Sequence, residues 1–345
     1  MFALLRAGLW GQLPEEALFE TVSFEEWKEL FTLAGDNKVT ALCCDGIERL
    51  PQQCRPPRGI WIPWVAERQK VEERYQHQLR VLGELENLFE PQGIRTLVLK
   101  GAAVGSYYPI PKHRQFDDLD LYHWGKWKEA DALVSQQLGV KVSNDAYHHT
   151  KYDYLGVTIE NHYTFVNCRN QRSDKDYERL LVAQLGESYN PTFEALFLMR
   201  HMSGHFASSR ITVRNLTDWL MFVERYRDCV DWEKISDVFN HYVMTPFVGT
   251  VHAILEDELG LQPVPHLHRN PDEKLNHRVL CDILYGEFAE MQHSQENLGR
   301  VFWKLRRYRA NRWKHQICYS DPWLSSFCRG IFAHMLKPRS IIHKM

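Results

Sequence analysis

The chain has 345 residues, of which 44% are hydrophobic and 25% are charged, with a formal net charge of −2. These proportions are ordinary for a globular protein and exclude a mainly disordered or collagen-like chain. No run approaches the ~18 consecutive apolar residues of a membrane span, and the N-terminus lacks the basic segment and apolar core of a signal peptide. The eight cysteines are scattered without a CxxC pair, so we expect free thiols and a cytoplasmic location.

Residues 1–90 are predicted to be helical. Residues 23–35 begin with a Ser and Glu capping pattern and carry apolar residues at helical spacing. Residues 50–63 are rich in proline and predict a break. From Trp64 to about Phe89, apolar residues recur at helical spacing among many charges, which predicts one long amphipathic helix.

Residues 91–170 are predicted to form a small α/β unit. The expected elements, in chain order, are a strand at 94–101, a short helix at 102–111, a strand at 114–123, a helix at 126–139 and a strand pair at 147–166 that turns near Gly156. Residues 171–345 read almost entirely as helices. We therefore expect an α+β fold, in which a small mixed β-sheet core is flanked by N-terminal helices and a large C-terminal helical domain.

The C-terminal segment is strongly basic. Residues 301–345 hold ten of the 42 Lys and Arg residues but one of the 44 acids, which leaves the first 300 residues with a net charge of −11. Residues 303–316 interleave Trp and Tyr with Arg, a pattern that can bind nucleic acid. The same spacing describes an amphipathic helix that packs on the acidic body of its own chain, and we favour that reading.

Carboxylates mark the α/β unit. Asp118 and Asp120 share one face of a predicted strand, because alternate residues of a strand point the same way, whereas Asp117 lies on the opposite face. Two adjacent carboxylates repel each other unless a cation lies between them, and hard divalent ions such as Mg²⁺ prefer oxygen ligands. Glu160, on a later apolar strand, becomes a third ligand if the two strands are neighbours. Each acid taken alone could equally be a solvated turn or edge residue.

Lys100 and Gly101 end a predicted strand and open a short helix. Amides exposed at such a turn can hold a phosphate, and glycine allows its close approach. A strand, a Lys-Gly turn, a helix, an Asp-x-Asp strand and a further acidic strand occur in the order that metal-assisted nucleotidyl transfer requires.

At this point the sequence resembles a known family. The segment LKGAAVGSYYPIPKHRQFDDLDLY is similar to the signature of the uncharacterised prokaryotic nucleotidyltransferases related to DNA polymerase β. The matching positions are Lys100, Gly101, Tyr108, Pro109, Arg114, Asp118, Leu119 and Asp120. The family's later motif is matched by Ile159, Glu160, Asn161 and His162. The segments RHMSGHFASSRITVRNLTDW and WKH also resemble the family's C-terminal half.

The resemblance implies a metal-dependent transferase that uses an NTP as donor and two Mg²⁺ or Mn²⁺ ions. Asp118, Asp120 and Glu160 would be the catalytic residues and metal ligands. The implied nucleotide contacts are Lys100, Gly101, Arg114 and His162. Where many members of the family have glycine before the first catalytic Asp, this chain has Asp117, and Lys-Gly replaces the usual Gly-Gly or Gly-Ser pair.

Several alternatives stay open at this stage. Lys100 could cap a strand end in solvent, and Arg114 could pair with Asp117 or another nearby acid. His201 and His205 have a spacing able to bind zinc, although a packed helix pair is favoured. The acceptor is not indicated by the sequence and could be a small molecule, a protein or a nucleic acid. A non-catalytic nucleotide-binding scaffold and a metal-dependent phosphohydrolase would use the same residues.

Overall fold

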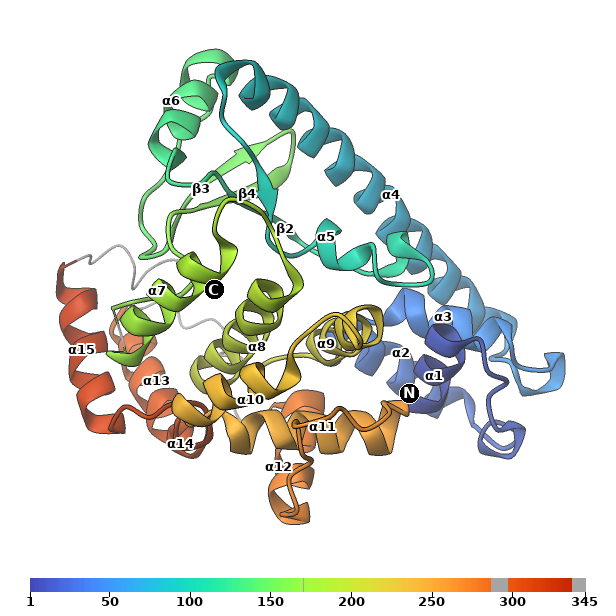
Figure 1. Cartoon of the computed structure of the whole chain (residues 1–345). Helices are drawn as coiled ribbons and strands as arrows, with labels where there is room; N and C mark the ends of the chain where they lie inside the picture. The colour runs from blue at the N-terminus through green and yellow to red at the C-terminus, as the bar shows by residue number, and fades with distance from the viewer. Residues whose placement is uncertain (170, 287–296, 337–345) are drawn as a thin grey trace.

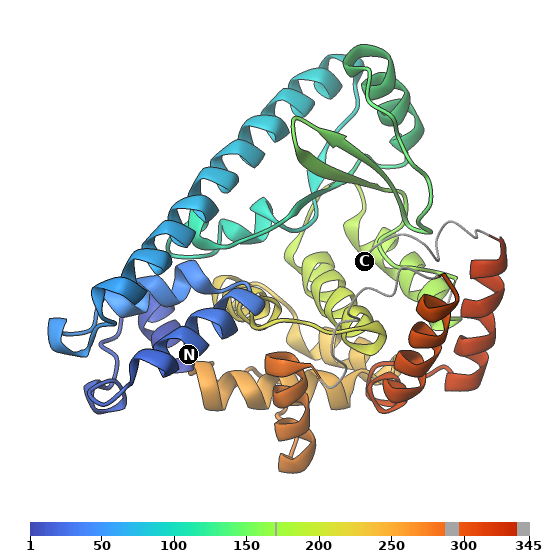
Figure 2. The same cartoon turned by 180° about the vertical axis from the view of Figure 1, so that it is seen from behind.

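The computed structural model describes residues 1–169, 171–286 and 297–336. The four-stranded sheet lies at one corner of the molecule, and the C-terminal helices form the opposite side (Figure 1). The long helix α4 (Arg58–Phe89) runs from the sheet to the N-terminal helices, as the view from behind also shows (Figure 2). No helix in the described ranges is both long and apolar enough to cross a membrane.

The N-terminal helices are α1 (Phe2–Trp10), α2 (Phe24–Asp36) and α3 (Thr40–Glu48). The predicted cap of α2 is confirmed, because the Ser23 side chain accepts from the Glu26 amide and the Glu26 carboxylate accepts from the Ser23 amide. The predicted break at 50–63 is too long, since α4 already begins at Arg58 and contains Pro63. Pro63 lies near the start of the helix, between the buried residues Ile60 and Trp64.

The sheet consists of β1 (Leu97–Val98), β2 (Asp118–Tyr122), β3 (His149–Tyr154) and β4 (Val157–His162), in the order β1-β2-β4-β3. β2 and β4 are parallel, and the other pairs are antiparallel. The predicted mixed sheet and the hairpin at Gly156 are therefore confirmed. β1 is shorter than expected, although the pairing with β2 continues past its end, where the Leu99 amide donates to the Asp120 carbonyl at 2.9 Å.

Helices make up the rest of the described chain. The α/β unit contains α5 (Ala102–Gly105) and α6 (Trp127–Leu138), which ends at Gly139 in the left-handed conformation, as predicted. The C-terminal helices are α7 (Ser173–Leu185), α8 (Pro191–Ser208), α9 (Val213–Tyr226), α10 (Trp232–His241), α11 (Thr245–Leu259), α12 (Glu273–Tyr285), α13 (Asn297–Ala310), α14 (Arg312–Cys318) and α15 (Trp323–Leu336). Short 3₁₀ helices occur at Glu16–Leu18, Gln52–Cys54, Glu90–Gln92 and Pro111–His113.

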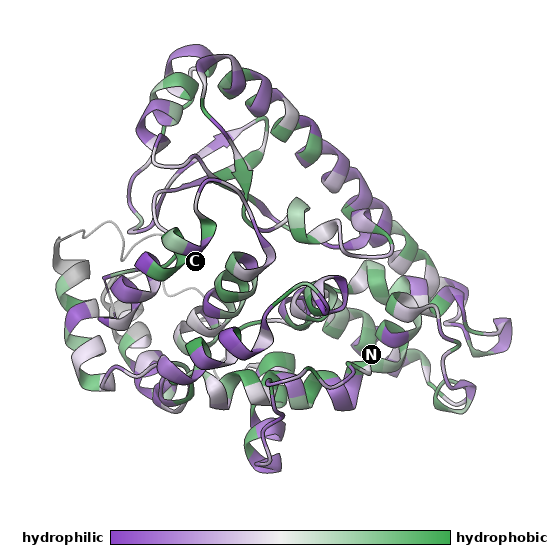
Figure 3. Cartoon of the chain, in the orientation of Figure 1, coloured by the Kyte–Doolittle hydropathy of each residue, from purple (hydrophilic) through white to green (hydrophobic). Residues whose placement is uncertain are grey.

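The buried apolar residues form two clusters. The larger one joins the N-terminal helices to the C-terminal ones, and Arg6 and Trp10 of α1 donate to backbone carbonyls at the end of α11, each at 2.7 Å. The smaller one packs one face of the sheet, including Leu119 and Ile159, against α4 and α6. Figure 3 shows polar residues along the outer side of α4. Asn161 of β4 is on the packed face and donates to Trp127 and Asp131 of α6, whereas Asp118, Asp120, Glu160 and His162 alternate with the packed residues and point to the other face.

Part of the basic C-terminal segment packs against the protein body. The Lys314 ammonium of α14 is buried and lies 2.6 Å from an Asp282 carboxylate oxygen of α12. Its Nζ also donates to the Ser209 carbonyl at 2.9 Å. Residues 337–345, the end of the predicted basic tail, lie outside the described residues.

Candidate active site

The site is built on two neighbouring parallel strands. The register of β2 and β4 places Asp118 opposite Thr158, Asp120 opposite Glu160 and Tyr122 opposite His162. Since alternate residues share a face, the expected acids and His162 lie on one surface of the sheet. The three residues predicted as metal ligands are thus on adjacent strands, 40 positions apart in the chain.

Asp120 lies at the centre of this surface and is 2% exposed. Its Oδ1 accepts from Lys100 Nζ and from His162 Nε2, each at 2.9 Å. Burial alone would raise the pKa of Asp120, but the Lys100 ammonium and the hydrogen bond from His162 lower it well below its usual value. Asp120 is therefore an ionised, firmly held carboxylate.

Glu160 and Asp118 are more accessible. Glu160 Oε2 lies 3.3 Å from His149 Nε2 and 3.9 Å from His162 Nε2. Burial and the charges of Asp120 and Asp118 raise the pKa of Glu160, and burial together with Asp120 raises the pKa of Asp118. The raised values show that the negative charges are crowded, and a bound cation would relieve that repulsion.

The donor set fits a divalent cation. Among the described residues, Asp120, Glu160 and His162 offer ligand atoms that all lie within 4.8 Å of one another. Two carboxylates suit Mg²⁺ or Mn²⁺, and an imidazole ligand is compatible with Mn²⁺ and other transition metals. Asp118 is not part of that close group, whereas His162, expected as a nucleotide contact, is.

Lys100 and Gly101 approach the carboxylates from the turn after β1. Lys100 Nζ bonds Asp120 and also lies 3.2 Å from His201 Nε2 of α8, so its ammonium is enclosed rather than a solvent cap. Although burial would lower the pKa of Lys100, Asp120 and Asp118 raise it. Gly101 has φ 58° and ψ −111°, a conformation that other residues rarely adopt, and an added Cβ would lie 3.1 Å from the Phe116 ring.

Arg114 is held by an acid of the helical region. Its Nε and Nη2 donate to Asp218 Oδ1 and Oδ2 of α9 at 2.9 and 2.6 Å, and Tyr108 donates to the same carboxylate at 2.7 Å. The partner is thus Asp218, not Asp117, which is exposed and pairs with Lys38 and Arg74. The Arg114 side chain is 4% exposed, so its fork is already occupied by a carboxylate.

The expected histidine pair on α8 lies near Lys100. The rings of His201 and His205 are 4.3 Å apart, and His201 faces the Lys100 ammonium at the edge of the site. Burial and the nearby Lys100 charge lower the pKa of His205 to about 4. The close donor group around the carboxylates does not include this pair, so the pair lines the site as uncharged imidazoles.

Sequence reasoning missed two side chains near the carboxylates. His149 of β3 is brought beside Glu160 and His162 by the antiparallel pairing of β3 and β4. The adjacent His148-His149 pair on a predicted strand could have indicated it. The other is Arg214 of α9, whose charge acts on Asp118. Arg214 lies within RHMSGHFASSRITVRNLTDW, the segment that resembles the family's C-terminal half, and that resemblance could have indicated it.

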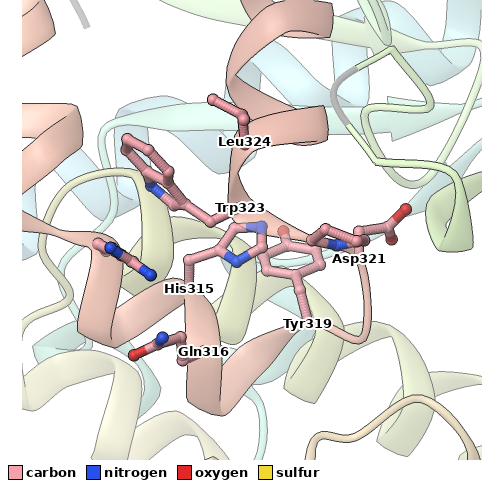
Figure 4. A pocket seen from close by; sticks show the side chains of 8 residues that line it. His315, Gln316, Tyr319, Asp321, Trp323 and Leu324 are labelled. Atoms are coloured by element: carbon pink, nitrogen blue, oxygen red, sulfur yellow. The ribbon is translucent and has the colours of Figure 1, made fainter.

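A separate cavity of about 520 Å³ lies between α14 and α15 (Figure 4). His315, Tyr319, Asp321 and Trp323 are among its eight lining residues, and the side chains gather at the junction of the two helices. None of these eight residues belongs to the group around Asp120. The cavity is therefore distinct from the carboxylate site.

The comparisons with known proteins agree with this geometry. A family model described as an uncharacterised nucleotidyltransferase matches residues 23–260, more than half of the chain. That span contains every site residue discussed above, from Lys100 to Asp218. No curated protein and no solved structure matches the chain at a significant level.

Proposed function

The chain belongs to this family of uncharacterised nucleotidyltransferases, and we propose that it transfers a nucleoside monophosphate from an NTP to an acceptor hydroxyl. The observation that carries the proposal is the register that sets Asp120 beside Glu160 on parallel strands, with His162 bonded to Asp120. The order of the motifs also supports a relationship to the DNA polymerase β-type superfamily.

We assign metal binding to Asp118, Asp120 and Glu160, which would hold two Mg²⁺ or Mn²⁺ ions. His162 orients Asp120 through its hydrogen bond and is close enough to serve as a further ligand. The chemistry supplied by such bound cations is polarisation of the α-phosphate and a lower pKa for the acceptor hydroxyl.

In the proposed reaction the acceptor oxygen forms a bond to the α-phosphorus. The bond from that phosphorus to the oxygen bridging to the β-phosphate breaks, and pyrophosphate leaves. Glu160 is suited to take the acceptor proton because its side chain stays 17% exposed.

The donor's phosphates would contact the turn after β1. Lys100 supplies a positive charge there, and Gly101, with φ 58° and ψ −111°, forms the turn that follows it. Arg114, implied by the resemblance as a phosphate contact, would act instead by holding the segment before β2 to Asp218. The acceptor is left unspecified, and nucleic acid is one candidate. A cytoplasmic location is supported by eight cysteines that are all free thiols.

The first test is thermal unfolding with ATP, GTP, CTP or UTP and Mg²⁺. A ligand at 100 times its Kd should stabilise the folded state by about 2.7 kcal/mol. We expect a Mg²⁺-dependent increase in Tm for at least one NTP, lost in Asp120→Asn and removed by EDTA. Asp117→Asn is the matched control, because Asp117 is adjacent in sequence but exposed and paired elsewhere.

The reaction type is read from the phosphate products. Nucleotidyl transfer predicts pyrophosphate and a modified acceptor, both dependent on Asp120. Orthophosphate or a nucleoside monophosphate without a modified acceptor would instead indicate a phosphohydrolase. Binding without turnover against every class of acceptor would indicate a scaffold. An NTP-induced change in Tm that is equal in wild type and Asp120→Asn contradicts the placement of the nucleotide at this site.

A further inference from the structure

Arg214, the second residue of α9, is near Asp117, Asp118 and Asp218 but makes no direct contact with a carboxylate among the described residues. Its Nη1 donates to the Gln115 carbonyl at 3.2 Å, and its Nε is buried with no hydrogen-bond partner among the described residues. It forms no ion pair with a described carboxylate. Burying part of a guanidinium without a directly bound counter-ion costs free energy. Such a group near a candidate active site suggests that a ligand supplies the missing partner.

The two most deeply buried arginines show how this fold normally satisfies that group. Arg114 binds Asp218 through Nε and Nη2, and Arg200 binds Asp174 through the same two atoms at 3.0 and 2.7 Å. This edge of the guanidinium holds planar acids and phosphates with two parallel hydrogen bonds. In Arg214 the Nε and Nη2 edge is the one without a partner among the described residues.

The position of Arg214 links it to the carboxylates. Its charge opposes the rise in the pKa of Asp118 on β2 that burial and Asp120 cause, and it adds to the lowering of the pKa of His205 on α8. Its hydrogen bond to Gln115 ties it to the segment that leads into β2. Burial and the nearby Arg114 charge lower its own pKa, yet a guanidinium keeps its charge at neutral pH. Arg214 therefore presents a permanent positive charge beside Asp118.

Three elements contribute nitrogen atoms to this side of the site. Lys100 comes from the turn after β1, His201 and His205 from α8, and Arg214 from α9. Lys100 contacts His201 directly, and the surrounding protein together with the Lys100 charge lowers the pKa of His205 to about 4. Two cations and two neutral imidazoles facing a group of acids suit a chain of phosphates, which needs charge balance and N–H donors.

We propose that Arg214 binds the polyphosphate chain of the nucleotide donor through its guanidinium group, with His201 and His205 lining the same surface. This inference rests on the proposed function and makes the C-terminal helices part of the active site. Arg214 acts as a binding residue, and it complements Lys100, whose ammonium is shared between Asp120 and His201.

The test compares Arg214→Gln and Arg214→Lys with wild type. Inorganic tripolyphosphate with Mg²⁺, and separately each NTP with Mg²⁺, is titrated by calorimetry. We expect Arg214→Gln to weaken binding about 10- to 100-fold, as removal of a bidentate charged contact does, and Arg214→Lys to restore part of it. Arg210→Gln is the matched control, because Arg210 has the same buried Nε without a hydrogen-bond partner among the described residues, while its Nη2 donates to the Asp36 carbonyl.

Stability without ligand separates binding from a structural role. Since Arg214 lacks a carboxylate partner, Arg214→Gln should leave the Tm unchanged or raise it, whereas a structural arginine should lower it. A lower Tm with unchanged affinity would overturn the inference. The inference would also be overturned if Arg214→Gln released pyrophosphate and bound NTP as well as wild type while Asp120→Asn was inactive. The proposed function would still stand in that case. If wild type binds no polyphosphate at all, both proposals fail.

Discussion

The Asp218→Asn substitution is expected to destabilise the whole fold, because it leaves Arg114 buried without a counter-charge. The side chains of Arg114 and Asp218 are 4% and 10% exposed. Two charged hydrogen bonds join them, and Tyr108 donates a third to the same carboxylate. The pair ties the segment before β2 to α9, so its loss affects the contact between the sheet and the helices.

The expected cost is about 3–5 kcal/mol, the usual range when one partner of a buried ion pair is removed. The amide oxygen of Asn can still accept from Tyr108, so most of the loss comes from the uncompensated Arg114 charge. Removing both charges costs less than the sum of the single changes. We therefore expect a coupling energy of about 2–3 kcal/mol between Arg114→Met and Asp218→Asn.

The assay is urea unfolding of wild type, both single variants and the double variant. Asp176→Asn serves as the control, since the Arg179–Asp176 pair is exposed, with side chains 79% and 65% accessible, and exposed pairs contribute about 0–1 kcal/mol. If Asp218→Asn costs no more than this control, or if the two single effects simply add, the argument that a buried charge pair stabilises this junction is wrong.

The same pair predicts a dependence on pH. Burial alone would raise the pKa of Asp218, but Arg114 and the hydrogen bonds lower it below its usual value. An acid whose folded-state pKa is lowered contributes stability that is present above its unfolded pKa, about 3.9, and lost as pH falls further. The difference in unfolding free energy between wild type and Asp218→Asn should therefore be constant at neutral pH and shrink below about pH 4.

Two further predictions concern backbone strain and a buried acid. Gly101→Ala should destabilise the fold by about 1–3 kcal/mol, because the residue has φ 58° and the new Cβ would lie 3.1 Å from Phe116. Gly83→Ala in α4 meets nothing within 4 Å and should stabilise the fold by about 0.5–1 kcal/mol. Thermal unfolding distinguishes the two variants, and equal effects would contradict the strain argument. Burial raises the pKa of Glu194 to about 8, although its hydrogen bond from Tyr107 opposes this. The stability that Glu194 contributes is therefore present at low pH and lost as pH rises from about 4.3 towards 8. In urea unfolding between pH 5 and 8, the unfolding free energy of wild type should fall relative to that of Glu194→Gln. Parallel pH profiles of the two proteins would refute this.

Local patterns in the sequence were enough to predict most of the elements. The Ser23 and Glu26 cap, the end of α6 at Gly139 and the hairpin at Gly156 all depend on residues a few positions apart. The same holds for the shared face of Asp118 and Asp120, which follows from the alternation of a strand. These features were predictable because their physical causes, capping, backbone conformation and side-chain alternation, act within a few residues.

The errors have a common cause in burial. The strand expected at 94–101 covers Leu97–Val98 in the structure, and α4 begins at Arg58, before its expected start at Trp64. In both cases an apolar run is buried by packing against other parts of the chain, which a periodicity argument cannot distinguish from strand pairing or a proline-rich break. Domain boundaries near residues 90 and 170 stay a prediction.

The sequence by itself was enough to predict which polar residues gather at the sheet: Asp118, Asp120, Glu160, His162 and the Lys100-Gly101 turn. Only the tertiary structure decided their partners. It paired Arg114 with Asp218, 104 positions away, and brought His201 to Lys100, 101 positions away. It also left the Nε edge of Arg214 without a partner near Asp118. Local spacing specifies which way a side chain points on its own element, whereas the packing of α8 and α9 against the sheet edge specifies what it meets.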